Sequence, residues 1–256
     1  MTSPTYTPPH VTAAYQLQWS YSIFWHETPT DFEWLETLKS AVEPDGLHLL
    51  KHHFEPPHTS QFLISSLPAV TPLLIAQRVK GRLQHLLRLG PRTFRRNYAL
   101  RSVGSTKREK VEAYVASQLR HHPLADPRVA ARFEKYQIHS PAIDLAAPQE
   151  TAHARYWYNL HCVFVMRDRE RHVQETTLST IQTTLIKAAE KKEHRLSRAG
   201  ILPDHIHLAV GCNLHESPEE IVLSYMNNLA YATKTALFDF GYWVGTFGEY
   251  DCGAIE

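Results

Sequence analysis

The chain has 256 residues, of which 43% are hydrophobic and 21% charged, and its formal net charge is +1. That length holds one large domain or two small ones with an ordinary buried core. No apolar run approaches the roughly 20 residues that span a membrane, and the polar start, Met1 to His10, lacks the pattern of a secretory signal. The three widely spaced cysteines, Cys162, Cys212 and Cys252, argue against a disulfide framework and predict a cytoplasmic location.

In chain order, the first half predicts a strand, a helix, two strands, a helix, a strand and a further helix. Their ranges are about 17–25, 31–42, 47–54, 60–66, 71–88, 97–103 and 107–121. A proline-containing linker follows, with a short helix from Arg128 to Tyr136. The second half then predicts the same order at about 156–166, 176–191, 194–201, 205–211, 217–237 and 241–247. The order β-α-β-β-α-β is typical of the ferredoxin-like fold.

Positive charge is concentrated in the first half of the chain. The stretch from Ala76 to Arg120 contains 12 Lys and Arg residues against 2 Asp and Glu, a net of +10. Such a stretch is either a solvated helix face or a surface for a polyanion. An aromatic residue within the run Arg92-Thr-Phe-Arg-Arg is typical of nucleic-acid binding. The residues that we expect to hold a nucleic-acid backbone are Arg78, Lys80, Arg82, Arg92, Arg95, Arg96 and Lys107.

The two halves resemble each other at several places in the same order. The stretch from Thr71 to Leu83 pairs with Ser217 to Leu229, each a hydroxyl residue followed by Pro, which predicts a helix start. Other pairings join 57–65 with 203–211, 97–104 with 241–248, and 19–24 with 159–164. The spacings are 146, 146, 144 and 140 residues, and the drifts fall in loops. This pattern indicates two tandem copies of one domain.

The second half contains two histidines at a spacing typical of a metal site. His205 and His207 are two residues apart in the segment Pro203-Asp-His-Ile-His-Leu, so on a strand they point to one face. Two imidazoles on one face can share a metal ion. With 17 histidines in the chain such a pair also arises by chance, but its place at the start of an apolar strand favours the metal.

The first half contains a tyrosine on its last predicted helix. Tyr114 and Gln118 are four residues apart and should share one face of that helix. A tyrosine oxygen can attack phosphorus if a nearby cation stabilises the developing charge. A lone helical tyrosine is more often a packing residue, so this interpretation depends on what lies beside it.

The order His-x-His, helix, Tyr-Trp-Val-Gly-Thr-x-Gly and then Tyr-x-x-x-Gln resembles the single-tyrosine HUH transposases. These include the insertion-sequence enzymes that move as single strands and the REP-associated tyrosine transposases. The resemblance covers nearly the whole chain, once per copy. It implies that His205, His207 and Gln118 bind Mg²⁺ or Mn²⁺, and that Tyr114 attacks the phosphate to give a 5′-phosphotyrosine link. The family works as dimers that can share a site between subunits.

Each copy departs from this pattern in a complementary way. The positions that match the histidine pair in the first copy are Thr59 and Gln61, while the second copy ends at Glu256, before a matching tyrosine. Tyr250 lies too early to replace it. We therefore predict a fused pseudo-dimer with one composite site, which could act as a monomer.

The predicted fold is α+β, with two tandem ferredoxin-like HUH domains that share a merged antiparallel sheet. The predicted parts are a first domain at 1–121, a linker at 122–153 and a second domain at 154–256. The predicted activity is that of a metal-dependent endonuclease and strand transferase on single-stranded or hairpin DNA.

Two other functions stay open from the sequence. The chain could be a domesticated relative that binds DNA or RNA hairpins without cutting them. It could also be a metal phosphodiesterase in which water replaces the tyrosine. The position of Tyr114 relative to His205 and His207 distinguishes the composite site from simple decay of both copies.

Overall fold

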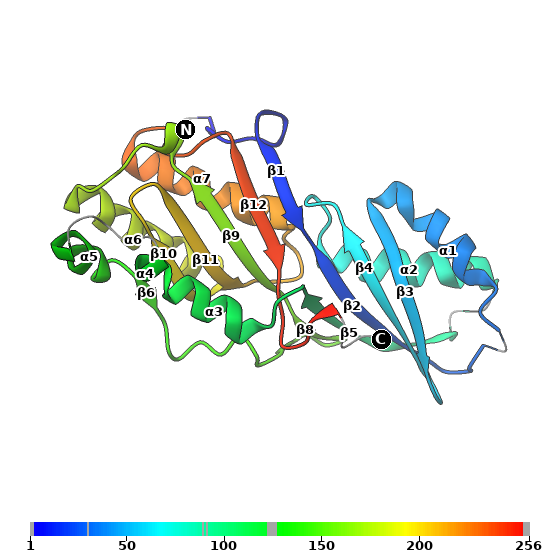
Figure 1. The fold of residues 1–256 in the computed structure, drawn as a ribbon. Helices are drawn as coiled ribbons and strands as arrows, with labels where there is room; N and C mark the ends of the chain where they lie inside the picture. Colours follow the sequence, from blue (N-terminus) through cyan, green and yellow to red (C-terminus); the bar gives the residue numbers. More distant parts are fainter. Residues whose placement is uncertain (1–2, 30, 89, 91, 122–126, 253–256) are drawn as a thin grey trace.

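A computed structural model describes residues 3–29, 31–88, 90, 92–121 and 127–252 as an α+β structure with two mixed sheets. The sheets lie end to end, so the molecule is elongated (Figure 1). Sheet A has the strand order β1-β12-β9-β11-β10-β6, and sheet B has the order β3-β4-β2-β5-β8-β7. None of the described helices is both long enough and apolar enough to cross a bilayer.

The strands are β1 (Thr12–Gln16), β2 (Gln18–Trp25), β3 (Leu47–Glu55), β4 (Thr59–Ser66), β5 (Phe94–Val103), β6 (Ile138–His139), β7 (Gln149–Glu150), β8 (Ala154–Trp157), β9 (Asn159–Val165), β10 (Arg195–Ile201), β11 (His205–Gly211) and β12 (Gly241–Thr246). The helices are α1 (Trp34–Val42), α2 (Pro72–Leu87), α3 (Arg108–Ala116), α4 (Gln118–His121), α5 (Pro127–Glu134), α6 (Glu175–Lys191) and α7 (Pro218–Thr233). The sequence predicts most of these elements but misses the short strands β1, β6 and β7.

The helices α2 and α7 begin where their sequences predict. Thr71 caps α2 by accepting a hydrogen bond from the Leu74 amide, and Ser217 forms a complete capping box with Glu220. Helix α7 ends at Lys234, whose φ of 60° is left-handed, so it is shorter than the predicted 217–237. A left-handed residue at this position stops the helix because it turns the backbone out of the helical path.

The expectation of one merged antiparallel sheet is wrong, because there are two sheets and both are mixed. The chain bends at the buried residues Leu17 and Tyr158. As a result β1 leaves β2 to pair in parallel with β12, and β8 leaves β9 to pair in parallel with β5. Each sheet therefore contains one strand from the opposite half of the chain.

The ladders of the two sheets correspond residue by residue. Trp19 faces Ile64 across β2 and β4, while Leu160 faces Val210 across β9 and β11. With β4 and β11 matched at a spacing of 146, β2 and β9 match at 141, so the sequence-based spacing of 140 is wrong by one residue. A slip of one residue turns every side chain to the opposite face of the sheet. A break in register also recurs at equivalent places, after Leu49 in β3 and after Leu196 in β10.

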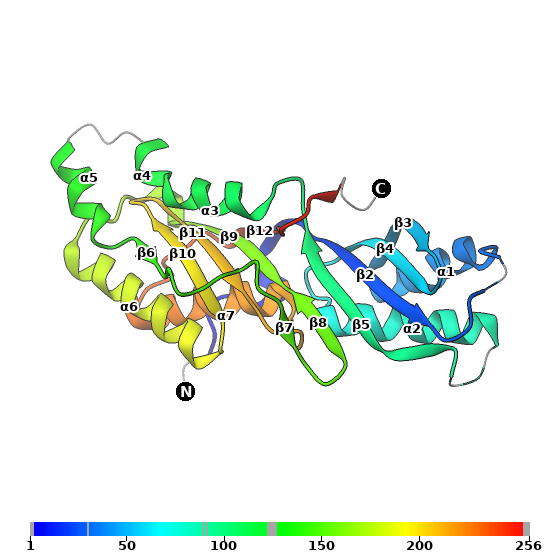
Figure 2. The same ribbon diagram turned by 90° about the horizontal axis from the view of Figure 1, so that it is seen from below.

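Helices cover the two sheets differently on their two faces. Figures 1 and 2 show α1 and α2 on one face of sheet B, and α6 and α7 on the corresponding face of sheet A. The other face of sheet A carries α3 (Figure 2). Among the described helices, none covers the equivalent face of sheet B. The predicted helix 107–121 is broken at Ser117, which separates α3 from α4.

Candidate active site

Helix α3 comes from the first half of the chain but packs on strands of the second half. Its apolar residues Val111 and Val115 form a buried cluster with Ala209, Phe247 and Leu145. The contact with β10 depends on Gly200. A Cβ at this residue would lie 3.0 Å from the Val115 carbonyl oxygen and 3.3 Å from Gln118 Cγ. The backbone of α3 can therefore approach sheet A only because residue 200 has no side chain.

Polar contacts at the start of α3 hold the helix in the same place. Arg108 pairs with Glu112 at 2.6 Å and with Glu249, beyond β12, at 3.0 Å. Glu112 accepts a hydrogen bond from the Ser197 hydroxyl on β10. The helix is thus fixed both to the sheet and to the segment that follows the last strand.

This docking brings Tyr114 to the histidine pair. The ring centroid of Tyr114 lies 5.5 Å from that of His207 and 6.0 Å from that of His161, with the ring planes nearly perpendicular. The rings of His205 and His207 lie 5.0 Å apart. Tyr114 is 43% exposed, whereas both histidines of the pair are buried. A substrate can therefore reach the phenol from solvent, beside a sheltered pair of imidazoles.

Both paired histidines form hydrogen bonds through Nδ1. His205 Nδ1 lies 2.8 Å from the Asp204 carboxylate, and His207 Nδ1 lies 2.9 Å from His161 Nε2. Burial lowers the pKa of His161 to about 4, so this ring is neutral near pH 7. Burial would raise the pKa of Asp204, but its hydrogen bond to His205 leaves it below the ordinary value. An acceptor at Nδ1 orients an imidazole so that Nε2 can act as a metal ligand.

Gln118 is fully buried next to this cluster. Its Nε2 donates to the Tyr114 carbonyl at 2.9 Å, and its Oε1 is buried with no hydrogen-bond partner among the described residues. The side chain lies over Gly200, which is the cross-strand partner of His207. A buried amide oxygen without a partner costs about 1–3 kcal/mol. A divalent cation would satisfy this oxygen, so the residue fits the ligand role that the sequence predicts.

The Asp204 carboxylate beside this cluster is hydrogen-bonded to His205. Within the described ranges, no group of three or more His, Cys, Asp or Glu residues is placed to hold a metal ion. The ligand set predicted from the sequence, His205, His207 and Gln118, includes only two residues of these types, so it stays a prediction.

The sequence interpretation does not include His161 or Asp204 as site residues. His161 lies on β9 diagonally across from His207, whose direct ladder partner is Val163, and the His161 ring packs edge-on against Trp243 at 5.0 Å. Period-two alternation along β9 is the signal that could have placed His161 on the same face of the sheet as the pair. Asp204 could have been found as the carboxylate directly before His205.

On the described strands of sheet B, the positions equivalent to His205 and His207 carry no histidine pair. Thr59 and Gln61 on β4 line a hollow together with Tyr250, so this tyrosine lies with the first-half residues. His52 points elsewhere and packs against Trp34 and Phe62.

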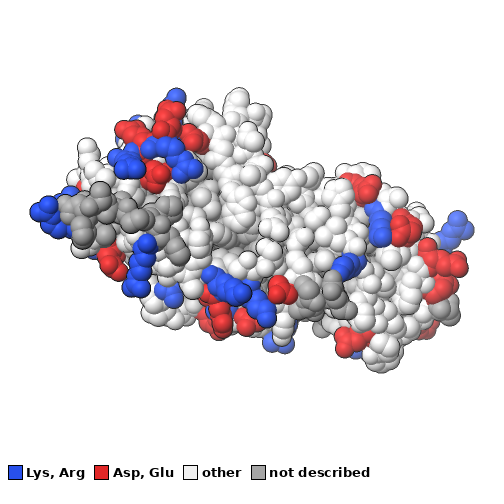
Figure 3. Space-filling view, in the orientation of Figure 1, with Lys and Arg blue, Asp and Glu red and all other residues white. Residues whose placement is uncertain are grey.

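The predicted nucleic-acid contacts lie on α2, at and near the start of β5, and just before α3. Arg78 and Arg82 both pair with Asp45, and Lys80 donates to the carbonyl oxygens of Arg95 and Arg96. Arg92, Arg95, Arg96 and Lys107 are exposed. On the face shown in Figure 3, basic and acidic side chains alternate around a largely uncharged centre. Arg78, Lys80 and Arg82 therefore already interact with groups of the protein itself.

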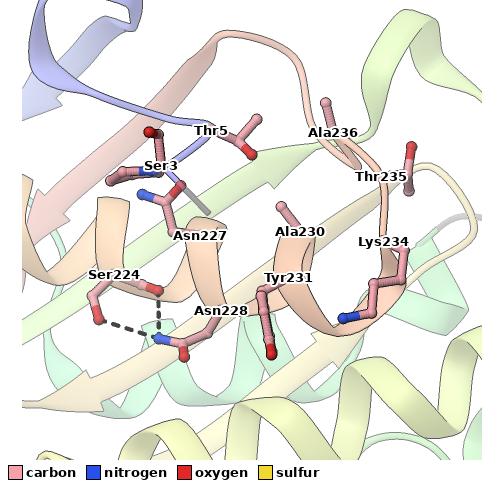
Figure 4. A pocket seen from close by; sticks show the side chains of 11 residues that line it. Ser3, Thr5, Ser224, Asn227, Asn228, Ala230, Tyr231, Lys234, Thr235 and Ala236 are labelled. Carbon is pink, nitrogen blue, oxygen red and sulfur yellow. Dashed lines mark hydrogen bonds between the residues drawn. The ribbon is translucent and has the colours of Figure 1, made fainter. Parts of the chain in front are cut away.

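A cavity of about 640 Å³ lies beside α7 and the N-terminal segment (Figure 4). Its walls include Ser224, Asn227, Asn228, Tyr231 and Lys234. The lining has no histidine, cysteine or carboxylate. Lacking a general acid, a general base and a metal ligand of those types, this cavity is a weaker candidate for chemistry than the Tyr114 cluster.

Residues 154–255 match the family model described as IS200-like transposase. No curated protein matches the chain. The second half is therefore similar to a transposase domain, which indicates a transposase-like function. The match includes His205 and His207 and leaves Tyr114 and Gln118 outside, so the family model alone would not connect the tyrosine with the histidines.

Proposed function

We propose that this protein is a metal-dependent endonuclease and strand transferase that acts on single-stranded or hairpin DNA. The observation that carries the proposal is the position of Tyr114, 5.5 Å ring to ring from His207, on a helix contributed by the other half of the chain. The similarity of residues 154–255 to IS200-like transposases supports the same chemistry.

The proposed ligands of Mg²⁺ or Mn²⁺ are His205, His207 and Gln118. When bound, such an ion polarises the scissile phosphate and offsets the negative charge that develops on it. Asp204 and His161 orient the two imidazoles through Nδ1. The buried Gln118 oxygen supplies the third ligand from the same segment that presents the nucleophile.

Tyr114 is the proposed nucleophile. Its oxygen attacks phosphorus in line, the bond from phosphorus to the 3′ oxygen breaks, and the phenolic proton leaves to solvent while the 3′ oxygen takes one up. The product is a 5′-phosphotyrosine and a free 3′-hydroxyl. Because the number of phosphoester bonds is unchanged, attack by a 3′-hydroxyl of another strand can reverse the step and release Tyr114.

We further propose that the two halves are copies of a ferredoxin-like HUH domain, fused as a pseudo-dimer. The support is the residue-by-residue correspondence of the ladders and the recurrence of the register break at equivalent positions in β3 and β10. Helix α3 then completes the site of the other copy, as a subunit would in a dimer. The domain boundaries at 121 and 154 belong to this proposal.

The test is covalent capture of DNA. The protein is incubated with a 3′-labelled DNA hairpin bearing single-stranded flanks and Mn²⁺, then denatured and separated by electrophoresis. We expect a labelled adduct with the wild type and at least a 1,000-fold lower yield (on the order of a lost nucleophile) with Tyr114→Phe. Tyr250→Phe is the matched control and should retain the adduct.

Three outcomes would overturn the assignment. An adduct that persists in Tyr114→Phe would show that another residue is the nucleophile. If the wild type cleaves DNA without forming an adduct, and Tyr114→Phe still cleaves it, water would be favoured as the nucleophile. Tight hairpin binding with neither cleavage nor adduct would favour the non-cleaving binding protein.

A further inference from the structure

The hollow on the open face of sheet B occupies the place that the histidine cluster occupies on sheet A. Through the ladder registers, Gln61 corresponds to His207 and Ser20 to His161. Both sheets have a side-chain hydrogen bond between these positions. Gln61 Nε2 donates to Ser20 Oγ at 2.8 Å in sheet B, and His207 Nδ1 lies 2.9 Å from His161 Nε2 in sheet A. An amide and a hydroxyl thus replace two imidazoles at equivalent places.

Large and small residues have exchanged places at the next strand. Trp243 and Gly245 on β12 correspond to Ala99 and Arg101 on β5. In sheet A the Trp243 ring lies over Gly245, where a Cβ would come within 2.5 Å of it. In sheet B the small Ala99 leaves a cavity of about 330 Å³. We name this cavity the Arg101 pocket; its lining includes Ser20, Ser22, Thr59, Gln61, Arg101 and Tyr250.

Arg101 is held by aromatic rings and not by carboxylates. Its guanidinium carbon lies 3.8 Å from the ring centroid of Trp157, its partner in the β5–β8 ladder, and 5.0 Å from that of Tyr250. The Trp157 ring is fixed by a 2.7 Å hydrogen bond from its Nε1 to the Ala146 carbonyl. Over the described part of the chain, no Asp or Glu lies within 4.0 Å of the guanidinium. A stacked guanidinium keeps its donors for a planar or phosphate-like partner.

The remaining walls suit a nucleobase. Tyr250 is 49% exposed, so one face of its ring is accessible for stacking. Gln61, Thr59 and Ser22 supply amide and hydroxyl groups to the same pocket. Glu55 lies at the wall as well, and its carboxylate suits the amino groups of a base rather than a second phosphate. Sequence-tolerant binding of single strands combines such aromatic stacking with basic contacts to the backbone.

We infer that the Arg101 pocket binds one unpaired nucleotide of the DNA, with its phosphate on Arg101 and its base against Tyr250. This inference rests on the proposed function, because it takes single-stranded DNA as the substrate. The first-half site has lost its metal ligands, and Arg101 provides a permanent positive charge in their place. The pocket anchors the strand on sheet B while the chemistry takes place on sheet A.

The test measures binding by fluorescence anisotropy in a Tyr114→Phe background, so that cleavage does not interfere. The probes are a labelled hairpin with a single-stranded flank and the same hairpin with blunt ends. Arg101→Gln should weaken binding of the flanked hairpin about 10-fold and lower the salt slope by about 1, as expected for one lost phosphate contact. Tyr250→Ala should weaken it at least 5-fold through lost stacking. Neither should change binding of the blunt hairpin.

Arg155→Gln is the matched control, because Arg155 also stacks on Trp157, at 5.5 Å, but lies outside the Arg101 pocket. It should change binding less than twofold. If Arg101→Gln and Arg155→Gln weaken binding equally, the loss comes from the removal of any positive charge and the inference is overturned. Binding by Arg101→Gln as tight as that of the wild type would also overturn it.

Adduct formation by the wild-type protein is measured separately. If that adduct forms while the Arg101 pocket variants bind normally, the pocket inference fails and the proposed function stands. If the wild type binds neither hairpin, both fail.

Discussion

Tyr114 and Gln118 lie four residues apart, yet their side chains have opposite exposures. Tyr114 is 43% exposed and Gln118 is 0% exposed. The break at Ser117 ends α3 between them, and Gln118 turns back to donate to the Tyr114 carbonyl. One short segment therefore presents a phenol to solvent and an amide oxygen to the interior.

We predict that the buried Gln118 Oε1, a proposed metal ligand, lowers the stability of the metal-free protein. Gln118→Met should raise the unfolding free energy of the metal-free protein by about 1 kcal/mol, because it removes a buried acceptor without a partner. The Tyr114 carbonyl keeps its two bonds from Ser117. Thermal unfolding with and without Mn²⁺ is the measurement, and the variant should lose the Mn²⁺-induced rise in Tm.

Gln118→Glu is the matched variant for that experiment. A carboxylate in the same place should lower stability without metal and restore the Mn²⁺ effect. An unchanged Mn²⁺ effect in Gln118→Met would remove this residue from the ligand set.

The sequence points to His205 and His207 but not to His161, which the structure places beside them. The spacing of His205 and His207 on one strand indicates a shared face, and this follows from strand geometry alone. The part played by His161 depends on which strand lies next to β11 and in which register, and that register differs by one residue from the sequence-based pairing.

Among the elements, the docking of α3 on sheet A decides whether a composite site exists. The helix buries only Val111 and Val115, and the contacts that hold it on sheet A come from residues distant in sequence, Ser197, Gly200 and Glu249. Local propensity predicts that a helix forms here, but it does not select the surface on which the helix packs.

We predict that Gly200→Val displaces α3 and separates Tyr114 from the histidines. The new side chain would enter the space of the Val115 carbonyl and Gln118, so adduct yield should fall more than 10-fold (about 1.4 kcal/mol or more). Circular dichroism should show that the sheets remain. Gly241→Ala is the control, because a Cβ there meets only the Thr12 carbonyl oxygen at 3.5 Å. A fully active Gly200→Val protein would contradict this account of the docking.

For the whole molecule, strand exchange joins the two sheets into one structure. Strand β1 completes sheet A and β8 completes sheet B. The segments that leave β5 and β12 also bridge each other, at Gly104 with Asp251 and Lys107 with Gly248. The relative position of the two candidate sites is therefore held by backbone pairing as well as by side chains.

Two histidines, the half-buried His52 and the buried His194, predict that stability falls in acid. Burial lowers the pKa of His52 to about 4, and it lowers the pKa of His194 despite the neighbouring Glu216 carboxylate. Each ring is neutral when folded, while the unfolded chain takes up a proton near pH 6.5, so stability is complete above that pH and is lost progressively toward pH 4. We expect Tm to fall by on the order of 5 °C between pH 7 and pH 5.

Calorimetry across that range is the measurement, and His52→Gln is the diagnostic variant. This variant should show a smaller fall of Tm with falling pH, because the His52 imidazole with its lowered pKa is gone. His48→Gln, at an exposed position on the same strand, is the control and should follow the wild type. A Tm that rises on acidification would contradict the assignment of these rings as neutral in the folded protein.

The sequence by itself determined most of the longer strands and helices, the capped starts of α2 and α7, and the shared face of His205 and His207, because these depend on local periodicity and short-range hydrogen bonds. Only the tertiary structure decided that there are two exchanged sheets, that α3 docks on sheet A, and that His161 joins the histidine pair. It also decided that Arg101 lines the equivalent hollow on sheet B. Those features arise from contacts between residues far apart in the sequence, such as Ser197 with Glu112, 85 positions apart, and Arg108 with Glu249, 141 positions apart. Long-range packing selects them from among many arrangements that the same local pattern allows.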